Sequence, residues 1–198
     1  GHSYTAVGGH RDNYPQTVTS KYPIETLLKI TDSDQAGKPI SHGAGIQQIT
    51  VKGRKINLVT LHTWPQAYAF QAVDRDASKA EHGGDRYRRM EIEYICSHTI
   101  ATQSDAGQQL WMMMGDFNSR SRRDNRVYNY PDDDTRLLVH DYIAEHTPYV
   151  DVIAEKHPGE FHTTTHGQSR IDFVYCTQPL CERITRAEVI ADDFTEPV

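Results

Sequence analysis

The order of apolar and β-branched segments along the chain constrains its fold more than any other feature. Strand-like segments follow one another directly in the first third of the chain, and helical patterns join them only afterwards. The predicted strands cover residues 17–22, 24–30, 45–51, 56–62, 109–114, 161–165, 171–175 and 186–190. Apolar residues at helical spacing predict helices over 87–95 and 135–145. This order indicates sheet layers with helices outside, an α/β sandwich rather than a regular βαβ alternation.

The composition excludes several classes of protein. A chain of 198 residues is long enough for one domain with a core. It contains no run of about 20 apolar residues, so no transmembrane segment is expected. Its three cysteines form no CxxC pair, which argues against both a disulfide framework and a thiolate zinc site. The 21 basic residues are outnumbered by 27 acidic ones, and this net charge of −6 argues against stable binding to duplex DNA.

Polar residues stand at the ends of three predicted strands, where open sheets place their ligand sites. Asp116 and Asn118 follow the apolar run 111–114, His62 ends the run 56–62, and Asp172 alternates with apolar residues. A carboxylate and an amide two residues apart can hold a metal-bound water and a phosphate oxygen. Each feature alone also fits a structural role: a turn that closes a strand, a structural histidine, or a carboxylate in an internal salt bridge.

Taken together, these segments resemble a known family. The sequence contains G-D-F-N at 115–118 and S-R-I-D-F-V at 169–174, with S-K-Y-P-I at 20–24 and the strand-end His62 upstream. In this order and spacing they closely resemble the endonuclease/exonuclease/phosphatase superfamily, across about residues 15–195. The resemblance implies a DNase I-like, four-layer α/β sandwich, in which two packed mixed β-sheets are flanked by helices.

The resemblance also implies roles for individual residues. Asp116 would contact the attacking water or a bound Mg²⁺ or Mn²⁺, and Asn118 would hold an oxygen of the scissile phosphate. His62 would contact the phosphate in the transition state, and Asp172 would orient a catalytic histidine. Arg170 is a further candidate for phosphate binding. One departure is Thr60, which stands where the family's N-T-H motif has Asn.

Two motifs of the family are absent from these residues. Its members carry an early Q-E motif, whose Glu binds the metal, and a late S-D-H motif with a metal ligand and the catalytic histidine. We therefore expect residues 1–198 to form a single, partial domain that is incomplete at both ends. A longer parent would be the active Mg²⁺-dependent hydrolase, and the 198-residue chain would be inactive alone. Because the chain begins with Gly1 rather than Met, the missing signal peptide leaves the compartment open, an extracytoplasmic one included.

Other interpretations stay open at this point. The protein could be a non-catalytic binding module of the same fold, or a zinc-dependent hydrolase built on His162 and His166, which a strand would place on one face. Four arginines that follow the G-D-F-N motif are better explained by a solvated loop of mixed charge than by phosphate contacts: Arg120, Arg122, Arg123 and Arg126. The substrate would be a phosphate ester in a small molecule, a lipid headgroup or a nucleic acid.

Overall fold

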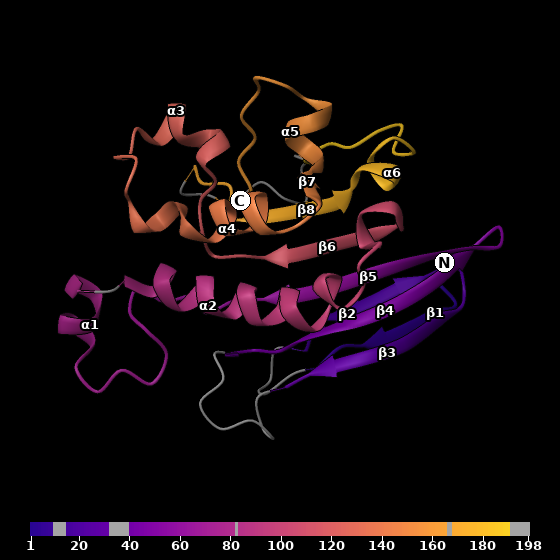
Figure 1. Ribbon diagram of the computed structural model, residues 1–198, viewed down its shortest axis with the longest axis horizontal. Helices are drawn as coiled ribbons and strands as arrows, with labels where there is room; N and C mark the ends of the chain where they lie inside the picture. Colours follow the sequence, from indigo (N-terminus) through magenta and orange to yellow (C-terminus); the bar gives the residue numbers. More distant parts are fainter. Residues whose placement is uncertain (10–14, 32–39, 82, 166–167, 191–198) are drawn as a thin grey trace.

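A mixed six-stranded sheet forms the centre of the molecule (Figure 1). The computed structural model describes residues 1–9, 15–31, 40–81, 83–165 and 168–190. The strand order in the large sheet is β3-β4-β5-β6-β8-β7, and β1 pairs with β2 in a separate two-stranded sheet. The strands are β1 (Tyr4–Val7), β2 (Thr17–Ser20), β3 (Ile24–Ile30), β4 (Ala44–Val51), β5 (Arg54–His62), β6 (Trp111–Asp116), β7 (Tyr149–Asp151) and β8 (Asp172–Thr177).

Most strands of the large sheet are antiparallel to their neighbours, but β5 and β6 run parallel. A parallel pair needs a long crossover, and here the helices between residues 63 and 110 provide it. The helices of the chain are α1 (Arg75–Glu81), α2 (Gly83–His98), α3 (Asn125–Tyr128), α4 (Leu138–His146), α5 (Val152–Lys156) and α6 (Gln178–Cys181), with short 3₁₀ turns between them.

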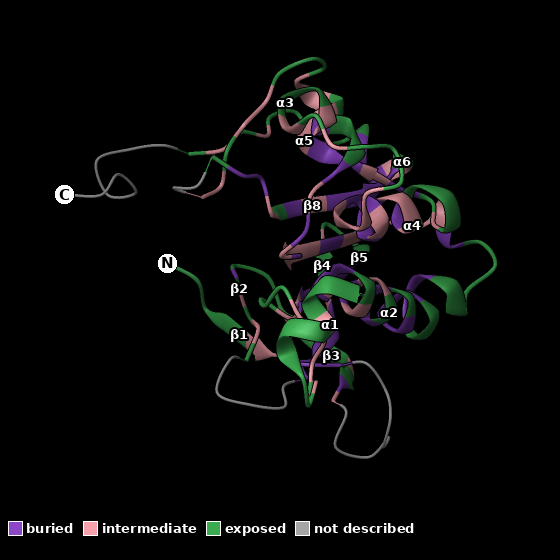
Figure 2. Cartoon of the chain, turned by 90° about the vertical axis from the view of Figure 1, so that its left-hand side faces the viewer, coloured by how far each residue is buried: buried purple, intermediate pink, exposed green. Residues whose placement is uncertain are grey.

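The main core lies between the large sheet and the helices α2 and α4, whose inner sides are buried (Figure 2). Alternate residues of each strand point to this side, because successive side chains of a strand point to opposite faces. Val59 of β5 and Met113 of β6 are opposite each other in the register, and both pack in the same cluster as Ile92 of α2. A smaller cluster on the other face includes Cys176 and Leu180.

The two-stranded sheet lies on the side of the large sheet away from α2 (Figure 2). Its chain continues to Gly9, whose N–H donates to the Ala44 carbonyl at 2.8 Å. A Cβ on Gly9 would stand 2.3 Å from the Ile30 carbonyl oxygen, so only glycine permits this close approach. Within the described residues, β1 and β2 are the whole of the second sheet that the resemblance implies.

Two predicted strands are wrong. Residues 161–165 form a loop, because the N–H groups of Thr164 and Thr165 both donate to the Ser169 carbonyl instead of to a neighbouring strand. Residues 186–190 are also irregular, and the Ala187 carbonyl accepts from the His157 imidazole rather than from a ladder partner. The remaining predicted strands and both helices are present, with ends shifted by a few residues.

The buried face of α2 also differs from the predicted apolar stripe. Met90 is half exposed, whereas Arg88 and Glu91 are among the buried residues of the helix. Glu91 lies on the predicted stripe together with Tyr94 and Ile95, whereas the burial of Arg88 is not predicted by periodicity. Both charged side chains belong to the polar network described below. No helix in the described part of the chain has the length and apolar character that membrane crossing requires.

Candidate functional site

Three of the candidate residues lie side by side at one end of the sheet. In the register, His62 at the end of β5 is opposite Asp116 at the end of β6, and Asp116 is opposite Asp172 at the start of β8. The His62 Nε2 atom is 3.8 Å from the Asp116 Oδ2 atom. Residues more than 100 positions apart in the sequence therefore meet at one strand-end cluster, which we call the Asp116 cluster (His62, Asp116, Asn118 and Asp172).

Gly115 allows β6 to run close beside β5 at this point. Its φ of +148° is one that side chains rarely adopt, and a Cβ would stand 1.9 Å from the Leu61 carbonyl oxygen. Any other residue would push the end of β6, and with it Asp116, away from β5. The close approach of the β5 and β6 backbones therefore explains why the G-D-F-N motif begins with glycine.

Asn118 is held in a tight turn directly after β6. Its N–H donates to Asp116 Oδ1 at 2.7 Å, and its side-chain Nδ2 donates to the Thr63 carbonyl at 3.1 Å. Its φ of +47° is left-handed, a conformation that Asn tolerates better than most residues. Phe117, between the two polar residues, is fully buried and anchors the turn in the core. The turn thus fixes the amide of Asn118 beside the carboxylate of Asp116.

The environment of Asp116 changes its acidity. Its pKa rises to about 6, chiefly because burial disfavours the charged form and also because Asp172 adds a like charge. The hydrogen bond from the Asn118 N–H and the charge of Arg88 act in the opposite direction. Asp116 therefore changes its charge close to neutral pH, a property found more often at functional sites than elsewhere.

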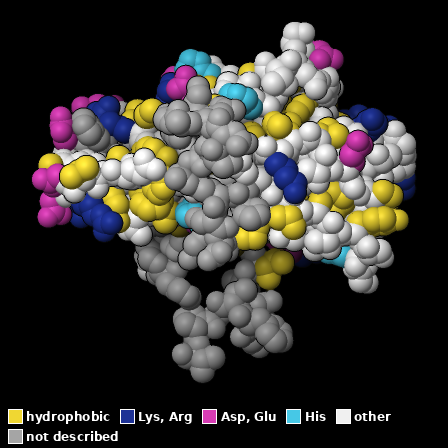
Figure 3. Space-filling model, turned by 90° about the horizontal axis from the view of Figure 1, so that it is seen from below, with side chains coloured by type: hydrophobic (Ala, Val, Ile, Leu, Met, Phe, Trp, Pro, Cys, Tyr) yellow, Lys and Arg dark blue, Asp and Glu magenta, His cyan; other side chains and the backbone are white. Residues whose placement is uncertain are grey.

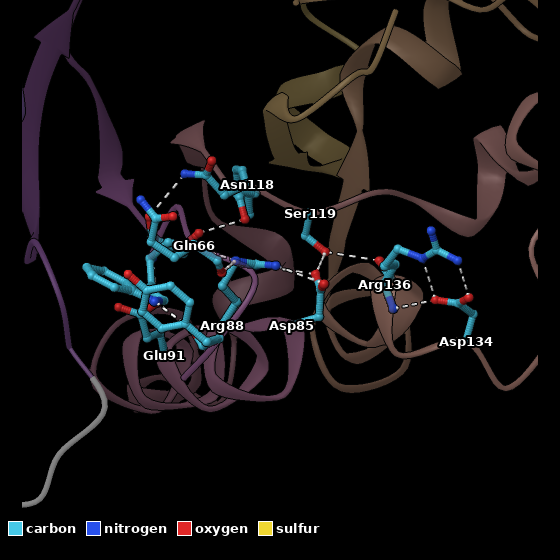
Figure 4. Close-up of polar contacts among 12 residues, drawn as sticks. Gln66, Asp85, Arg88, Glu91, Asn118, Ser119, Asp134 and Arg136 are labelled. Atoms are coloured by element: carbon cyan, nitrogen blue, oxygen red, sulfur yellow. Dashed lines mark hydrogen bonds and ion pairs between the residues drawn. The ribbon is translucent and has the colours of Figure 1, made fainter. Parts of the chain in front are cut away.

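A buried polar network lies beneath the loop that follows His62 (Figure 4). The Glu91 carboxylate accepts hydrogen bonds from the Ser41 N–H, from the Ser41 hydroxyl and from the Trp64 N–H, at 2.5–2.8 Å. Burial raises the pKa of Glu91 to about 7. The Arg88 guanidinium donates to the carbonyls of Trp64 and Gln66, each at 2.8 Å. These contacts fix the backbone that leads away from His62.

The same network extends to the turn after Asn118. Arg88 forms a buried ion pair with Asp85 at 2.8 Å, and the Ser119 hydroxyl donates to Asp85 at 2.9 Å (Figure 4). Helix α2 therefore supports both sides of the Asp116 cluster. His42 belongs to the surroundings as well, since its ring stacks on His62 with centroids 4.4 Å apart. No motif or periodic pattern in the sequence pointed to His42 or to this network.

An open, polar cleft of about 670 Å³ adjoins the cluster, and Asn118 lines it. Two of the cleft's guanidinium groups are already paired, Arg88 with Asp85 and Arg136 with Asp134. The third, Arg120, forms no ion pair with the described residues. Its Nη2 donates to the Ser169 hydroxyl at 2.9 Å, and its buried Nε has no hydrogen-bond partner among the described residues. Arg120 is thus the guanidinium of this cleft that is most open to an anion.

Arg170 does not line the cleft, so its predicted role in phosphate binding is not supported and needs correction. Its guanidinium is 3% exposed and donates to both Asp124, at 2.8 Å, and Asp151, at 2.6 Å. It also lies over the Phe173 ring, 4.4 Å from the centroid. All of these contacts are internal, and Arg170, just before β8, is tied to the 3₁₀ turn before α3 and to the end of β7.

Two other arginines of the loop after Asn118 fit the predicted solvated surface of mixed charge. Arg122 pairs with Asp141 and Arg123 with Glu155, both at the surface. On the face shown in Figure 3, the Lys and Arg side chains lie apart from one another and partly beside Asp and Glu side chains.

The donor set near Asp116 is small for a hard cation. Mg²⁺ requires about six oxygen ligands in near-octahedral geometry, several of which are usually waters. Within the described ranges, Asp116 belongs to no group of three His, Cys, Asp or Glu side chains whose ligand atoms lie within 4.8 Å of one another. The described residues therefore do not by themselves make a complete Mg²⁺ or Mn²⁺ site, and Asp116 can supply one oxygen ligand.

We predict that Asp172→Asn lowers the pKa of Asp116 in the 198-residue chain, because it removes the like charge that opposes ionisation. Carboxyl NMR titration of the wild type and the variant measures this directly. Asp133→Asn, at an exposed position, is the matched control and should leave the pKa of Asp116 unchanged. An equal or higher pKa in Asp172→Asn would contradict the arrangement of the two carboxylates.

Comparison with known proteins gives the fold. No protein-family model and no curated protein matches the sequence. The structure of the human Nocturnin catalytic domain with bound sulfate anion is similar, with a TM-score of 0.55, 10% identity, and coverage of 88% of this chain and 60% of that one. An endonuclease/exonuclease/phosphatase family protein from Leptotrichia buccalis follows at 0.49, with 13% identity and coverage of 88% and 59%.

A third match is the structure of D. rerio TDP2 complexed with single-strand DNA product, with a TM-score of 0.46, 13% identity and coverage of 88% and 61%. The chain thus spans about 60% of the length of these proteins. The likeness to Nocturnin confirms the α/β fold that the sequence motifs predict, the fold of the endonuclease/exonuclease/phosphatase superfamily. At this identity it shows the fold alone, and the roles of the site residues stay predictions.

Proposed function

We propose that this chain provides part of the active site of a hydrolase that cleaves phosphate esters by attack of water on phosphorus. The observation that carries the proposal is the Asp116 cluster, in which a histidine, two carboxylates and an amide meet at the ends of three strands. These groups match the needs of the reaction: an anion to hold a water, and donors to neutralise charge on the phosphoryl oxygens.

The roles follow from the position of each group. Ionised Asp116 accepts a hydrogen bond from the attacking water and orients it. Asn118 has a second Nδ2 hydrogen besides the one given to the Thr63 carbonyl, and it donates this hydrogen to a phosphoryl oxygen. His62 donates to another phosphoryl oxygen when its facing nitrogen is protonated. Because the turn and the α2 network fix these groups in advance, they need little reorganisation in the transition state.

Mg²⁺ or Mn²⁺ is part of the proposal as cofactor. Such a cation would neutralise charge on the phosphate, with Asp116 as one of its ligands, and the remaining protein ligands would come from outside residues 1–198. Both tasks require the ionised carboxylate, which metal-free Asp116 carries above about pH 6. Protons should therefore compete with the cation as the pH falls through about 6, so the Mg²⁺ concentration needed for activity should rise there.

The cleft beside Asn118 favours a small or single-stranded phosphodiester over duplex DNA. Arg120 offers one guanidinium that is not in an ion pair with the described residues, and it stands over the stacked rings of Tyr128 and Tyr130, 5.4 and 5.9 Å from their centroids. This guanidinium could bind one anionic group of the substrate, such as a phosphate, in addition to the phosphate that is cleaved. A duplex would need many neutralised phosphates, and the net charge of −6 does not favour them.

The test is hydrolysis of a panel of phosphodiesters and monoesters, with Mg²⁺ added or chelated. We expect the 198-residue chain alone to stay at background. A longer protein that adds the Q-E and S-D-H motifs should turn over at least one ester when Mg²⁺ is present. In that protein Arg120→Gln should raise KM, whereas Arg122→Gln, at the surface, is the control. Failure of the longer protein on every ester would favour the non-catalytic binding module.

A further inference from the structure

A second group of ligand-type side chains lies apart from the Asp116 cluster. His157, at the end of α5, and Glu160 and His162, in the following loop, bring their ligand atoms within 4.8 Å of one another. No other such group of three His, Cys, Asp or Glu residues occurs in the described part of the chain. None of the three lines the cleft beside Asn118. We propose that His157, Glu160 and His162 bind a transition-metal dication, and that Zn²⁺ is the best match.

A tight turn brings the first two residues together. The Glu160 N–H donates to the His157 carbonyl at 3.1 Å, which closes a four-residue β-turn. Pro158 occupies its second position and Gly159, with φ of +83°, its third. Proline followed by a residue with positive φ is the signature of a type II turn. The turn places His157 Nδ1 3.7 Å from Glu160 Oε2 without any bound ion.

The protonation of His157 suits a metal ligand. Its Nε2 is 2.6 Å from the Ala187 carbonyl, a group that can only accept, so Nε2 carries the hydrogen. In the neutral ring Nδ1 then keeps its lone pair, on the side that faces Glu160. Histidine ligands of metals usually donate their other N–H to a carbonyl or carboxylate in this way.

His162 completes the set. Its Nε2 is 3.4 Å from Glu160 Oε2, and its ring centroid is 5.1 Å from that of His157. This Nε2 is buried and makes no hydrogen bond to the described residues, and its approach to the Glu160 carboxylate is favourable only when Nε2 carries a hydrogen or a cation lies between the two atoms. The neighbouring Phe161 is fixed by an edge contact with Tyr128, which limits how far His162 can move.

The ligand types select the metal. Two imidazoles and one carboxylate suit Zn²⁺, whereas Mg²⁺ and Ca²⁺ prefer oxygen ligands alone. Around tetrahedral zinc, ligand atoms about 2.0–2.1 Å from the ion stand about 3.3 Å apart, close to the two separations above. A water would fill the fourth position. This site differs from the pair His162 and His166 considered from the sequence, because residue 162 lies in a loop and His166 is outside the described residues.

The bound ion would order residues 157–162, and its ligand His157 connects them to a distant segment. His157 contacts Ala187 directly, and Ala187 and Ile184 pack on the smaller core cluster that includes Val152. A ligand that binds only the folded state stabilises it by mass action, so Zn²⁺ should raise the melting temperature of the chain. The inference does not rest on the proposed hydrolase activity.

The test uses Co²⁺, which replaces Zn²⁺ and gives a visible absorption spectrum when it binds nitrogen ligands at low coordination number. Tag-free, metal-stripped 198-residue chain is titrated with Co²⁺ and then with Zn²⁺. We expect one Co²⁺ per chain, displaced by Zn²⁺, and a weakening of Co²⁺ affinity by more than about tenfold in both His162→Ala and Glu160→Gln. Glu160 is mostly exposed, so Glu160→Gln should fold normally, which circular dichroism checks.

Two controls separate this site from other histidines. His146→Ala, at an exposed histidine beside Glu145, and His62→Ala, in the Asp116 cluster, should both bind Co²⁺ as the wild type does. Absence of the Co²⁺ spectrum in the wild type would overturn the proposal, as would unchanged binding in Glu160→Gln. Loss of binding in His62→Ala with normal binding in His162→Ala would place the metal at the Asp116 cluster instead.

Discussion

Replacement of Arg170 by methionine is expected to lower the free energy of unfolding by about 3–5 kcal/mol. The guanidinium is nearly inaccessible and bonds to Asp124 and Asp151, which are themselves 6% and 2% exposed. Methionine retains most of the aliphatic stem but leaves two buried carboxylates without their cation. The loss then comes from uncompensated charge rather than from an empty cavity.

Urea unfolding of the 198-residue chain measures this effect. Arg122→Met is the matched control, because Arg122 pairs with Asp141 at the surface, where solvent screens the two charges and the pair contributes little to stability. Acidification should reduce the difference between wild type and Arg170→Met, since burial raises the pKa of Asp124 and a protonated carboxyl no longer needs a cation. A loss below about 1 kcal/mol would show that Arg170 is not the internal link that its contacts indicate.

The case of Arg170 shows what sequence can and cannot predict here. The motif S-R-I-D-F-V located the strand β8 and placed Asp172 near its start, because alternation along a strand and the spacing of family motifs can both be read from the linear sequence. The partners of Arg170 are 19 and 46 residues away, at the end of the short strand β7 and in a 3₁₀ turn, elements too short to give a periodic signal. The sequence could therefore suggest Arg170 as a phosphate-binding cation, but only the fold showed that its guanidinium is paired with two internal carboxylates.

The same limit applies to the helices and loops around the site. Periodicity located α2, yet Glu91 and Arg88 are buried because they bind the backbone at Ser41, Trp64 and Gln66, contacts that depend on how the loops return to the helix. The predicted strand over 161–165 failed for a related reason. Its β-branched threonines favour a strand, but Thr164 and Thr165 instead hydrogen-bond to Ser169 and close a loop. These hydrogen bonds outweigh the strand propensity of the segment.

The spatial grouping of His62, Asp116 and Asp172 was the most predictable feature around the candidate site. Strand ends of a parallel pair meet at one edge, so His62 and Asp116 had to be neighbours once β5 and β6 were paired. The acidity of Asp116 could not be predicted from the sequence. The raised pKa of Asp116 arises from its burial and from Asp172, neither of which is visible before the strands are assembled.

These surroundings lead to an expectation about Asp116→Asn in a longer protein that is active. The substitution should reduce turnover by roughly 10²–10⁴-fold, the range for loss of one acid–base or charge-stabilising group. The fold should be kept, because the asparagine oxygen can still accept the hydrogen bond from the Asn118 N–H. Activity assays beside Asp133→Asn, an exposed control, measure the effect. Turnover within a few-fold of the wild type would remove Asp116 from the proposed mechanism.

Stability should change in the opposite direction to activity. The pKa of Asp116 is raised from 3.8 to about 6 in the folded protein, so the fold favours the protonated carboxyl. That contribution is fully present below about pH 4 and is lost as the pH rises through about 6, because the buried group must then ionise. Asparagine mimics the neutral form at every pH. Asp116→Asn should therefore melt at about the wild-type temperature near pH 4 and above it near pH 8, where the wild-type carboxyl is ionised.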